Sequence, residues 1–256
     1  MILKEILISV IICAHNEEKY VGKCLAGVEK ALRGVDGEVI FVADRCTDNT
    51  VNIAMNFNVS KLVNKTWRRW NNSYAESLQV GFLNSSGKYV SIVDADILIP
   101  ENFFDEMLPL IKGNIASVSA KVETYPSTLL NSIINIWEKT HNVTPFLREP
   151  RGAARIIRRE ILHKIGGFKD TPAPDTDIDI RLRKAGYQSV YNHRTSVWHL
   201  RENTLSKVVS RQLSSGAARY NLKIGFMRTL AHSVFRLRPL VIYGWFIEKL
   251  RKSENQ

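Results

Sequence analysis

Cysteine is scarce in this sequence, and long apolar runs are missing from it. The three cysteines, Cys13, Cys24 and Cys46, are an odd number without the spacing of metal ligands. They argue against a disulfide framework and favour a reducing compartment. No stretch reaches the roughly 18 apolar residues of a membrane-spanning helix, and the early acid Glu5 is not typical of a secretory signal. We therefore expect a cytoplasmic protein.

Acidic residues are also few relative to basic ones, 25 against 36, which gives a net charge of +11. Such an excess indicates a polyanionic partner: nucleic acid, an anionic membrane surface or a phosphorylated substrate. The basic excess is concentrated from Arg201 onward. Hydrophobic residues make up 45% of the 256 residues, an ordinary value for a globular chain whose core needs no disulfide or metal to hold it.

The first hundred residues alternate between strand-like and helix-like segments. Branched aliphatic runs predict strands at 7–13, 38–43, 59–63 and 88–93. Apolar residues at helical spacing predict helices at 17–32, from about residue 50, and at 72–83. This alternation implies an α/β fold, with a Rossmann-like, mostly parallel central sheet that has helices on both faces.

The second half of the chain is less regular. Strands are predicted at 117–123, 153–157 and 189–197, and helices at 129–140, 158–165 and 176–185. The tail from residue 206 has a mostly helical pattern. We expect one large domain over residues 1–205, divided near residue 100, and a basic, aromatic-containing helical extension over 206–256.

Two aspartates one residue apart, Asp94 and Asp96, follow the predicted strand at 88–93. Ligands of open α/β sheets collect at the carboxyl ends of the strands, where two carboxylates repel each other unless a cation lies beside them. Mg²⁺ and Mn²⁺ take oxygen ligands, commonly one or two carboxylates together with substrate phosphates. The pair therefore predicts a divalent-metal site, with two solvated acids capping a turn as the alternative.

Three further polar segments lie at strand ends or helix starts. They are Cys13-Ala14-His15-Asn16-Glu17, Ala43-Asp44-Arg45-Cys46-Thr47-Asp48, and Pro174-Asp175-Thr176-Asp177-Ile178, which follows Gly166-Gly167-Phe168. Together with Asp94-Ala95-Asp96 they resemble, in order and spacing, the motifs of glycosyltransferase family 2, whose catalytic domain has the GT-A fold. His15 stands where the family has a tyrosine, and Pro174 stands where it has a glutamate. Each motif alone is weak, but four in order over this alternation are specific.

The resemblance implies a metal-dependent, inverting glycosyltransferase of the hexosyltransferase type. Such an enzyme moves a sugar from a nucleotide-diphosphate sugar, with UDP expected ahead of GDP, to an acceptor hydroxyl or phosphate. The donor half would cover about residues 1–100 and the acceptor half about 101–205. The implied donor-binding residues are Ala14, His15, Asn16, Glu17, Asp44, Asp94, Ala95 and Asp96.

The chemistry of sugar transfer gives the acids different tasks. A divalent ion, Mg²⁺ or Mn²⁺, meets the charge that grows on the leaving diphosphate, and we expect Asp96, Asp94 and His199 to bind it. The acceptor hydroxyl loses its proton to a general base, which the resemblance places at Asp175. Purely structural roles remain open for Asp175 and Asp44. Asp175 would be the N-cap of its helix, and Asp44 would stabilise an Asx-turn in its polar loop.

Several other residues are expected near the diphosphate or the acceptor, namely Arg68, Arg69, Arg201, Gly152 and Trp137. The helix predicted from residue 72 would also point its N-terminus at the diphosphate. Aromatic and basic residues over 230–250 suit a membrane interface, so the tail either lies at the inner face of the plasma membrane or packs as helices against the domain. Membrane contact would favour a lipid-phosphate or cell-surface polysaccharide acceptor.

Two other functions fit part of the pattern. A sugar-nucleotide nucleotidyltransferase would need a glycine-rich loop after the first strand, and residues 13–17 contain no glycine. A non-catalytic nucleic-acid-binding protein would fit the net charge, but only Trp67 and Trp70 supply aromatics among the basic residues in the way that base stacking needs. We therefore expect no nucleic-acid partner.

Overall fold

The computed structural model describes residues 6–129, 131–132, 153–202, 204–221, 224–235 and 237–253. The chain divides into two compact units. The described residues of the first unit are 6–125 and 153–201. Those of the second unit are 126–129 and 131–132, together with the described residues from 202 to 253.

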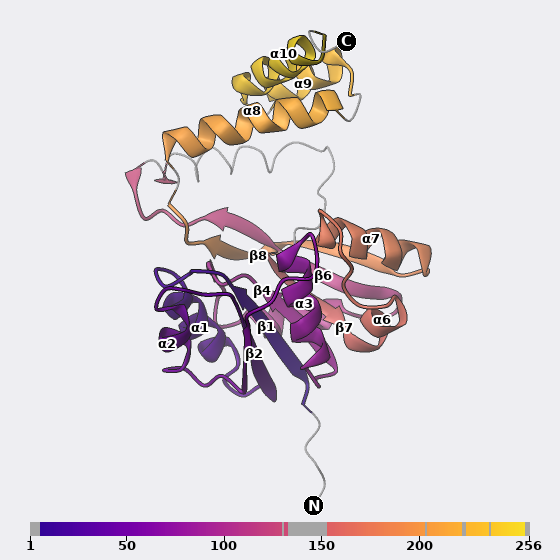
Figure 1. The fold of residues 1–256 in the computed structure, drawn as a ribbon. Coiled ribbons are helices and arrows are strands. Elements are labelled where there is room, and N and C mark those ends of the chain that lie inside the picture. Colours follow the sequence, from indigo (N-terminus) through magenta and orange to yellow (C-terminus); the bar gives the residue numbers. More distant parts are fainter. Residues whose placement is uncertain are drawn as a thin grey trace, which may run out of the picture. The chain divides into compact units, whose positions relative to one another are not determined.

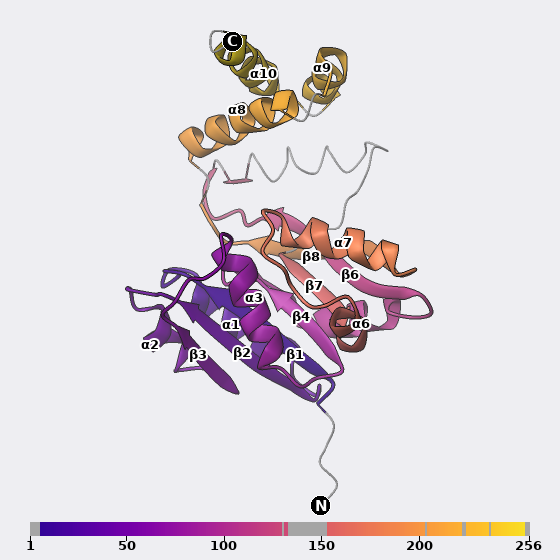
Figure 2. The ribbon, with the colours of Figure 1, turned by 45° about the vertical axis from the view of Figure 1, so that its right-hand side comes forward.

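The first unit is built around one mixed sheet (Figures 1 and 2). The strand order is β3-β2-β1-β4-β7-β6-β8-β5. The strands are β1 (Ile8–Ala14), β2 (Gly37–Asp44), β3 (Lys61–Lys65), β4 (Tyr89–Val93), β5 (Ile97–Leu98), β6 (Ile115–Thr124), β7 (Ala154–Arg158) and β8 (Gln188–His199). The four strands β3, β2, β1 and β4 are parallel, β7 is antiparallel to β4 and β6, and β5 is antiparallel to β8.

Helices cover both faces of this sheet (Figure 2). Residues of α1 (Val21–Ala31), α2 (Thr50–Ala54) and α4 (Phe103–Met107) join the core on one face, and the 3-10 helix η1 (Leu108–Leu110) follows α4. Residues of α3 (Ser73–Leu83), α6 (Arg159–Lys164) and α7 (Pro174–Lys184) join the core on the other face. Along β1, Val10 and Ile12 face the first core while Ile11 faces the second, because side chains alternate along a strand. The predicted α/β fold with helices on both faces is confirmed.

Most predicted elements are found with their ends displaced by a few residues. The third strand, predicted at 59–63, runs over Lys61–Lys65, because its register against β2 pairs Asn64 with Ala43 and Lys65 with Asp44. Ladder pairing, rather than apolar pattern, therefore decides where this strand ends. The elements β5, α4 and η1 were not predicted, since two to five residues are too few to show a period. The helix predicted at 129–140 lies mostly outside the described residues.

The second unit contains three described helices, α8 (Leu205–Asn221), α9 (Phe226–Phe235) and α10 (Pro239–Ser253), so the predicted helical tail is found. Two glycines bring α8 and α10 together. A Cβ on Gly216 would lie 2.1 Å from the carbonyl oxygen of Val241, and one on Gly244 would lie 2.2 Å from that of Leu213. Aromatic rings cluster beside this contact, with the Tyr220 and Trp245 centroids 5.2 Å apart. Over the described residues, the helices are too short or too polar to cross a bilayer.

Candidate active site

The carboxyl ends of β3, β2, β1 and β4 lie at the same edge of the sheet, because these strands are parallel. Lys65 and Asp44 are the last residues of β3 and β2, Ala14 is the last residue of β1, and Asp94 follows β4 directly. The start of α3 comes to this edge as well, since Ser73 contacts Asp44 and Tyr74 contacts Asp94. The fold thus gathers polar side chains from distant segments at one place.

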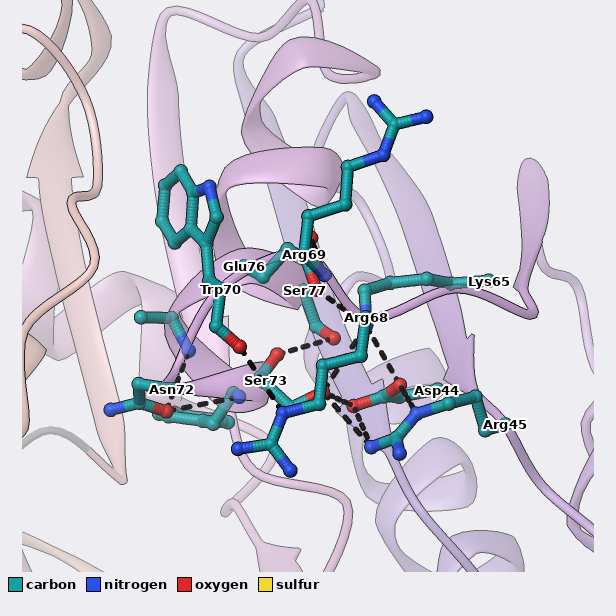
Figure 3. Close-up of polar contacts among 12 residues, drawn as sticks. Asp44, Arg45, Lys65, Arg68, Arg69, Trp70, Asn72, Ser73, Glu76 and Ser77 are labelled. Atoms are coloured by element: carbon teal, nitrogen blue, oxygen red, sulfur yellow. Dashed lines mark hydrogen bonds and ion pairs between the residues drawn. The ribbon is translucent and has the colours of Figure 1, made fainter.

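Asp44 lies at the centre of a network of polar contacts (Figure 3). Its Oδ1 accepts hydrogen bonds from Lys65 Nζ and Arg45 Nε, both at 2.8 Å, and its Oδ2 accepts one of 2.5 Å from Ser73 Oγ. Burial by itself would raise the pKa of Asp44, but the hydrogen bonds from Arg45, Lys65 and Ser73 hold it at about 2. Asp44 is therefore ionised at neutral pH.

Lys65 is the buried cation of this network, with 0% of its surface exposed. A second carboxylate, Oε2 of Glu76, lies 3.1 Å from its Nζ. Glu76 also accepts a hydrogen bond of 2.9 Å from the backbone N–H of Arg69 through Oε1, which fixes the loop before α3. Buried charges are tolerated only when they are paired, and here one ammonium group joins two carboxylates.

Asp94 occupies a different environment from Asp44. Its Oδ1 accepts a hydrogen bond of 2.6 Å from the hydroxyl of Tyr74. Burial raises the pKa of Asp94 to about 7, and the negative charges of Asp96 and Asp175 add to this against the effect of the Tyr74 hydrogen bond. Asp96 and Asp175 therefore lie close enough to Asp94 for their charges to raise its pKa.

Asp96 is 5% exposed and is contacted by His199, the last residue of β8, and by Arg201, two residues further on. Pairing of β5 with β8 sets Ile97 opposite His199, so that His199 Nε2 lies 3.2 Å from Asp96 Oδ2. The guanidinium of Arg201 bridges two acids: its Nε donates to Asp96 Oδ2 and its Nη2 to Glu17 Oε1. Burial raises the pKa of Glu17, while the charge of Arg201 opposes this rise.

The fit of a divalent ion to these residues can be judged from their donor atoms. Among the residues that the structure describes, no group of three or more His, Cys, Asp or Glu side chains is arranged to hold a metal. Asp96 and His199 do converge, whereas Asp94 turns one oxygen to Tyr74. One carboxylate, one imidazole and the oxygens of a diphosphate suit a site that Mg²⁺ or Mn²⁺ shares with its substrate. The donor types of Asp96 and His199 therefore suit such an ion, which would take the place of Arg201 at Asp96 Oδ2.

Asp175 lies in the first turn of α7, on the second core face of the sheet. Its Oδ1 is buried and has no hydrogen-bond partner among the described residues. Burial raises the pKa of Asp175, the charge of Arg155 opposes the rise, and Asp179 adds to it. Because the charge of Asp175 also raises the pKa of Asp94 and of Tyr74, its carboxylate belongs to the same cluster.

Arg155 on β7 is 0% exposed and binds two residues of α7. Its Nη2 donates a hydrogen bond of 2.6 Å to Asp179 Oδ1, and its Nη1 donates one of 3.3 Å to the carbonyl oxygen of Asp175. A buried guanidinium thus fixes both the backbone of Asp175 and the next acid on the same helix face. The predicted N-cap role is not found, since Ala173 is the N-cap residue and Pro174 begins the helix.

The loop after β1 carries the other predicted donor-binding residues. His15 is exposed, and its Nδ1 lies 2.6 Å from the carbonyl oxygen of Asp44. Asn16 has a φ of 55° and accepts a hydrogen bond of 2.8 Å from the backbone N–H of Thr47. These contacts tie the two loops after β1 and β2 together. Ala14 and Ala95 are buried and offer only backbone groups.

The backbone N–H groups at the start of α3, predicted to bind phosphate, donate hydrogen bonds to other protein groups. The side chain of Asn72 accepts hydrogen bonds from the N–H groups of Tyr74 and Ala75. Asp170 accepts hydrogen bonds of 2.9 Å from the N–H groups of Asn71 and Asn72. Four of the amide donors expected there thus have protein partners, while the direction of this helix toward a diphosphate stays a prediction.

Arg68 and Arg69 precede this helix and are both exposed. Arg68 donates hydrogen bonds to the carbonyl oxygens of Trp70 and Asn71, within its own loop. Figure 3 shows the guanidinium of Arg69 turned away from the Asp44 network. A cavity of about 560 Å³ beside Arg68 is also lined by Asn71, Asn72, Ser73, Tyr74, Asp170 and Pro172. Gly152 and Trp137, predicted on the acceptor side, lie outside the described residues.

Four site residues were missed by the sequence analysis: Arg45, Lys65, Tyr74 and Arg155. A weak signal existed for two of them, since Lys65 follows the apolar Leu62-Val63 and Arg155 interrupts the apolar run over 153–157. Nothing local distinguishes Tyr74 from an ordinary helix residue. Arg45 was read only as part of a polar loop.

The model of the family described as Glycosyl transferase family 2 matches residues 9–166, which is more than half of the chain. The chain therefore belongs to this family, as its motifs predicted. The poly-beta-1,6-N-acetyl-D-glucosamine synthase of Staphylococcus epidermidis is 24% identical over 214 residues, which are 77% of this chain and 51% of that protein. A dolichol-phosphate mannosyltransferase of Pyrococcus furiosus is 28% identical over 127 residues, 46% of this chain and 36% of that protein. The chain spans about half the length, or less, of these curated relatives.

Two solved structures share the fold. A mannosyltransferase from Pyrobaculum calidifontis, in complex with GDP-Man and Mn²⁺, has a TM-score of 0.65 at 18% identity and covers 99% of this chain and 76% of its own. Glucosyl-3-phosphoglycerate synthase from Mycobacterium tuberculosis, in complex with Mn²⁺, UDP and phosphoglyceric acid, has a TM-score of 0.55 at 19% identity, covering 82% and 76%. At these identities the likeness shows the fold, which is the predicted GT-A fold.

Proposed function

We propose that this protein is a glycosyltransferase that moves a sugar from a nucleotide-diphosphate sugar to an acceptor hydroxyl or phosphate. The observation that carries the proposal is the grouping of carboxylates at one edge of a GT-A sheet, where Asp96 lies beside His199 and the charges of Asp96 and Asp175 act on buried Asp94. Three acids so close together suit a reaction that needs a bound cation and a separate base. Family membership supports the same reaction class.

Asp96 and His199 are the residues that would hold Mg²⁺ or Mn²⁺, with the remaining positions filled by diphosphate oxygens. A bound ion would neutralise the charge that develops on the leaving diphosphate. Arg201 supplies a positive charge at the same place, since its guanidinium already contacts Asp96 and Glu17. Its release from Asp96 would leave it free to donate hydrogen bonds to a phosphate oxygen.

Asp175 is the proposed general base. Its unpartnered, buried Oδ1 is available to accept the proton of the acceptor hydroxyl, and Arg155 holds its backbone in place. A base that activates the acceptor on the face opposite the leaving group inverts the configuration of the anomeric carbon. A positioned base contributes about 10²–10⁴-fold in rate, so most of the turnover depends on this carboxylate.

The donor is proposed to be a UDP-sugar or a GDP-sugar. The basic, partly exposed aromatic tail supports peripheral contact with an anionic membrane, because Tyr243 and Phe246 of α10 are 60% and 41% exposed on a helix that ends in basic residues. That contact in turn favours an acceptor that carries a lipid phosphate.

The experiment is a thermal-shift series with UDP- and GDP-sugars, with and without Mn²⁺, on the wild type and three variants. Ligand binding to the native state raises the melting temperature by mass action. We expect a metal-dependent shift in the wild type, its loss in D96N, and a retained shift without turnover in D175N. D105N, at an exposed position of α4, is the matched control and should behave as the wild type. No shift with any nucleotide sugar would contradict the proposal.

A further inference from the structure

Arg45 has an unusual backbone for its residue type. Its φ is 51°, in the left-handed region that glycine adopts freely and that arginine rarely does. The structure holds Arg45 there through its side chain, which contacts Asp44 and Ser73, and through a hydrogen bond of 2.8 Å from its N–H to the carbonyl oxygen of Lys65. A residue kept in a disfavoured conformation by several contacts is a candidate for function.

Asp44 has no acceptor capacity left for a ligand. An ionised carboxylate offers about four lone-pair sites. Oδ1 uses two of them for Lys65 Nζ and Arg45 Nε, both at 2.8 Å. Oδ2 uses the other two for Ser73 Oγ at 2.5 Å and Arg45 Nη2 at 3.4 Å. An N–H group of a bound base could reach Asp44 only by displacing one of these partners.

Arg45 itself keeps free donors. Its Nε and Nη2 are engaged by Asp44 and Ser73, whereas Nη1 has no hydrogen-bond partner among the described residues. The side chain is 34% exposed, so part of it is open to a ligand. Arginine is a donor only, and this group therefore recognises acceptor oxygens.

The position of Arg45 in the sheet indicates which part of a nucleotide it meets. Arg45 directly follows β2, and Asp94 and Asp96 follow β4. One strand, β1, lies between β2 and β4 in the sheet. Two strand spacings amount to roughly 10 Å, which is about the span from a diphosphate to the far end of its nucleoside. A diphosphate held beside Asp96 would bring the nucleoside to the end of β2.

We propose that Arg45, rather than Asp44, contacts the nucleoside of the donor, through an acceptor oxygen of the base or the ribose. Asp44 and Lys65 are then positioning residues: Asp44 binds the Arg45 guanidinium, and Lys65 binds Asp44 (Figure 3). Uracil and guanine both carry keto oxygens that an arginine N–H can reach. The inference rests on the proposed function, because it places a nucleotide at this edge of the sheet.

The test measures binding of UDP, GDP and inorganic pyrophosphate, each with Mn²⁺, by calorimetry. Two variants, R45G and R45N, remove the guanidinium, and both new residues tolerate a positive φ. We expect each to bind UDP and GDP at least about tenfold more weakly, as loss of a charge-assisted hydrogen bond implies, and to bind pyrophosphate within about twofold of the wild type. L237G relieves another positive φ, of 48°, in the second unit and should leave all three affinities unchanged.

Protein stability distinguishes the ligand-contacting role of Arg45 from the positioning role of Asp44. R45G and R45N should melt close to the wild type, because neither leaves a buried charge without a partner. D44N should melt well below it, because Lys65 is fully buried and loses an ionised partner. A variant of Arg45 that binds both nucleotides as tightly as the wild type would overturn the proposal.

The pyrophosphate measurement identifies the group that is bound. If the Arg45 variants lose as much affinity for pyrophosphate as for UDP, Arg45 contacts the diphosphate. That result would overturn the assignment of Arg45 to the nucleoside. A wild-type protein that binds pyrophosphate but neither nucleotide would overturn both this inference and the proposed function. A wild type that binds nucleotides, with unaffected Arg45 variants, would remove only the inference.

Discussion

The hydroxyl of Tyr74, in the first turn of α3, donates a hydrogen bond of 2.6 Å to Oδ1 of Asp94 at the end of β4. This bond favours the ionised carboxylate, but burial and the neighbouring acids outweigh it, so that the pKa of Asp94 is about 7. Asp94 therefore changes its charge near neutral pH, whereas Asp44, with its pKa of about 2, remains ionised. Two acids at the same sheet edge thus have pKa values shifted in opposite directions, upward for Asp94 and downward for Asp44.

The raised pKa of Asp94 predicts that the metal-free protein loses stability as pH rises. The unfolded chain releases this proton near its ordinary pKa of 3.8, while the native state keeps it up to about 7. Between those values the native state binds more protons than the unfolded state, so the free energy of unfolding falls with rising pH. The loss is on the order of 2–4 kcal/mol across the window.

The variant D94N should remove this loss, because asparagine keeps an acceptor for Tyr74 without a charge. We expect D94N to be more stable than the wild type at pH 8 and to differ little at pH 4, in urea denaturation with EDTA. D105N, which changes an exposed aspartate, should follow the wild type. Equal pH slopes for D94N and the wild type would show that Asp94 titrates normally.

The buried ammonium group of Lys65 should be essential to the fold of the first unit. Replacement by methionine leaves Asp44 and Glu76 without the cation that lies 2.8 Å from one and 3.1 Å from the other. Breaking a buried ion pair by removing one partner costs about 3–5 kcal/mol, and K65M should lose that much in chemical denaturation. K61M, on the exposed start of the same strand, should cost less than about 0.5 kcal/mol. Similar stabilities for the two variants would contradict the pairing.

Arg155 should set the pH dependence of catalysis. Its charge lowers the pKa of Asp175, so R155Q should raise that pKa and move the acidic limb of the kcat/KM profile to higher pH. Asp179, Asp94 and Tyr74 also face Asp175 and stay in place in this variant. R155K keeps the charge and should return the limb toward the wild type, and R183Q, at an exposed position of α7, is the control. A limb that does not move in R155Q would mean that Asp175 is not the titrating base.

The contact between α8 and α10 should tolerate no added methyl group. A Cβ on Gly244 would lie 2.2 Å from the carbonyl oxygen of Leu213, which is backbone and cannot rotate away. Although alanine is the better helix former by about 1 kcal/mol, overpacking costs typically about 1–3 kcal/mol, so G244A should destabilise the second unit. Hydrogen exchange of α8 and α10 measures this. G225A, with no atom within 4 Å of its Cβ, should leave exchange unchanged, and equal exchange in both variants would refute the close contact.

Much of the fold was predictable because its pattern is local. The alternation of Val10, Ile11 and Ile12 between two cores is a property of any strand buried on both faces. The ends of the parallel strands then place Asp44, Asp94 and Asp96 at one edge without knowledge of strand order. The short elements β5 and α4 and the ladder-determined end of β3 were not predictable, since pairing partners rather than composition define them.

The sequence by itself determined the family, the α/β architecture and the identity of the acids at the strand ends. Only the tertiary structure decided which cation each acid meets. Lys65 reaches Asp44 across 21 residues, Arg155 reaches Asp179 across 24, and Arg201 reaches Asp96 across 105. Electrostatic pairing depends on distance in space and on burial, and both of these arise from the order in which the strands assemble.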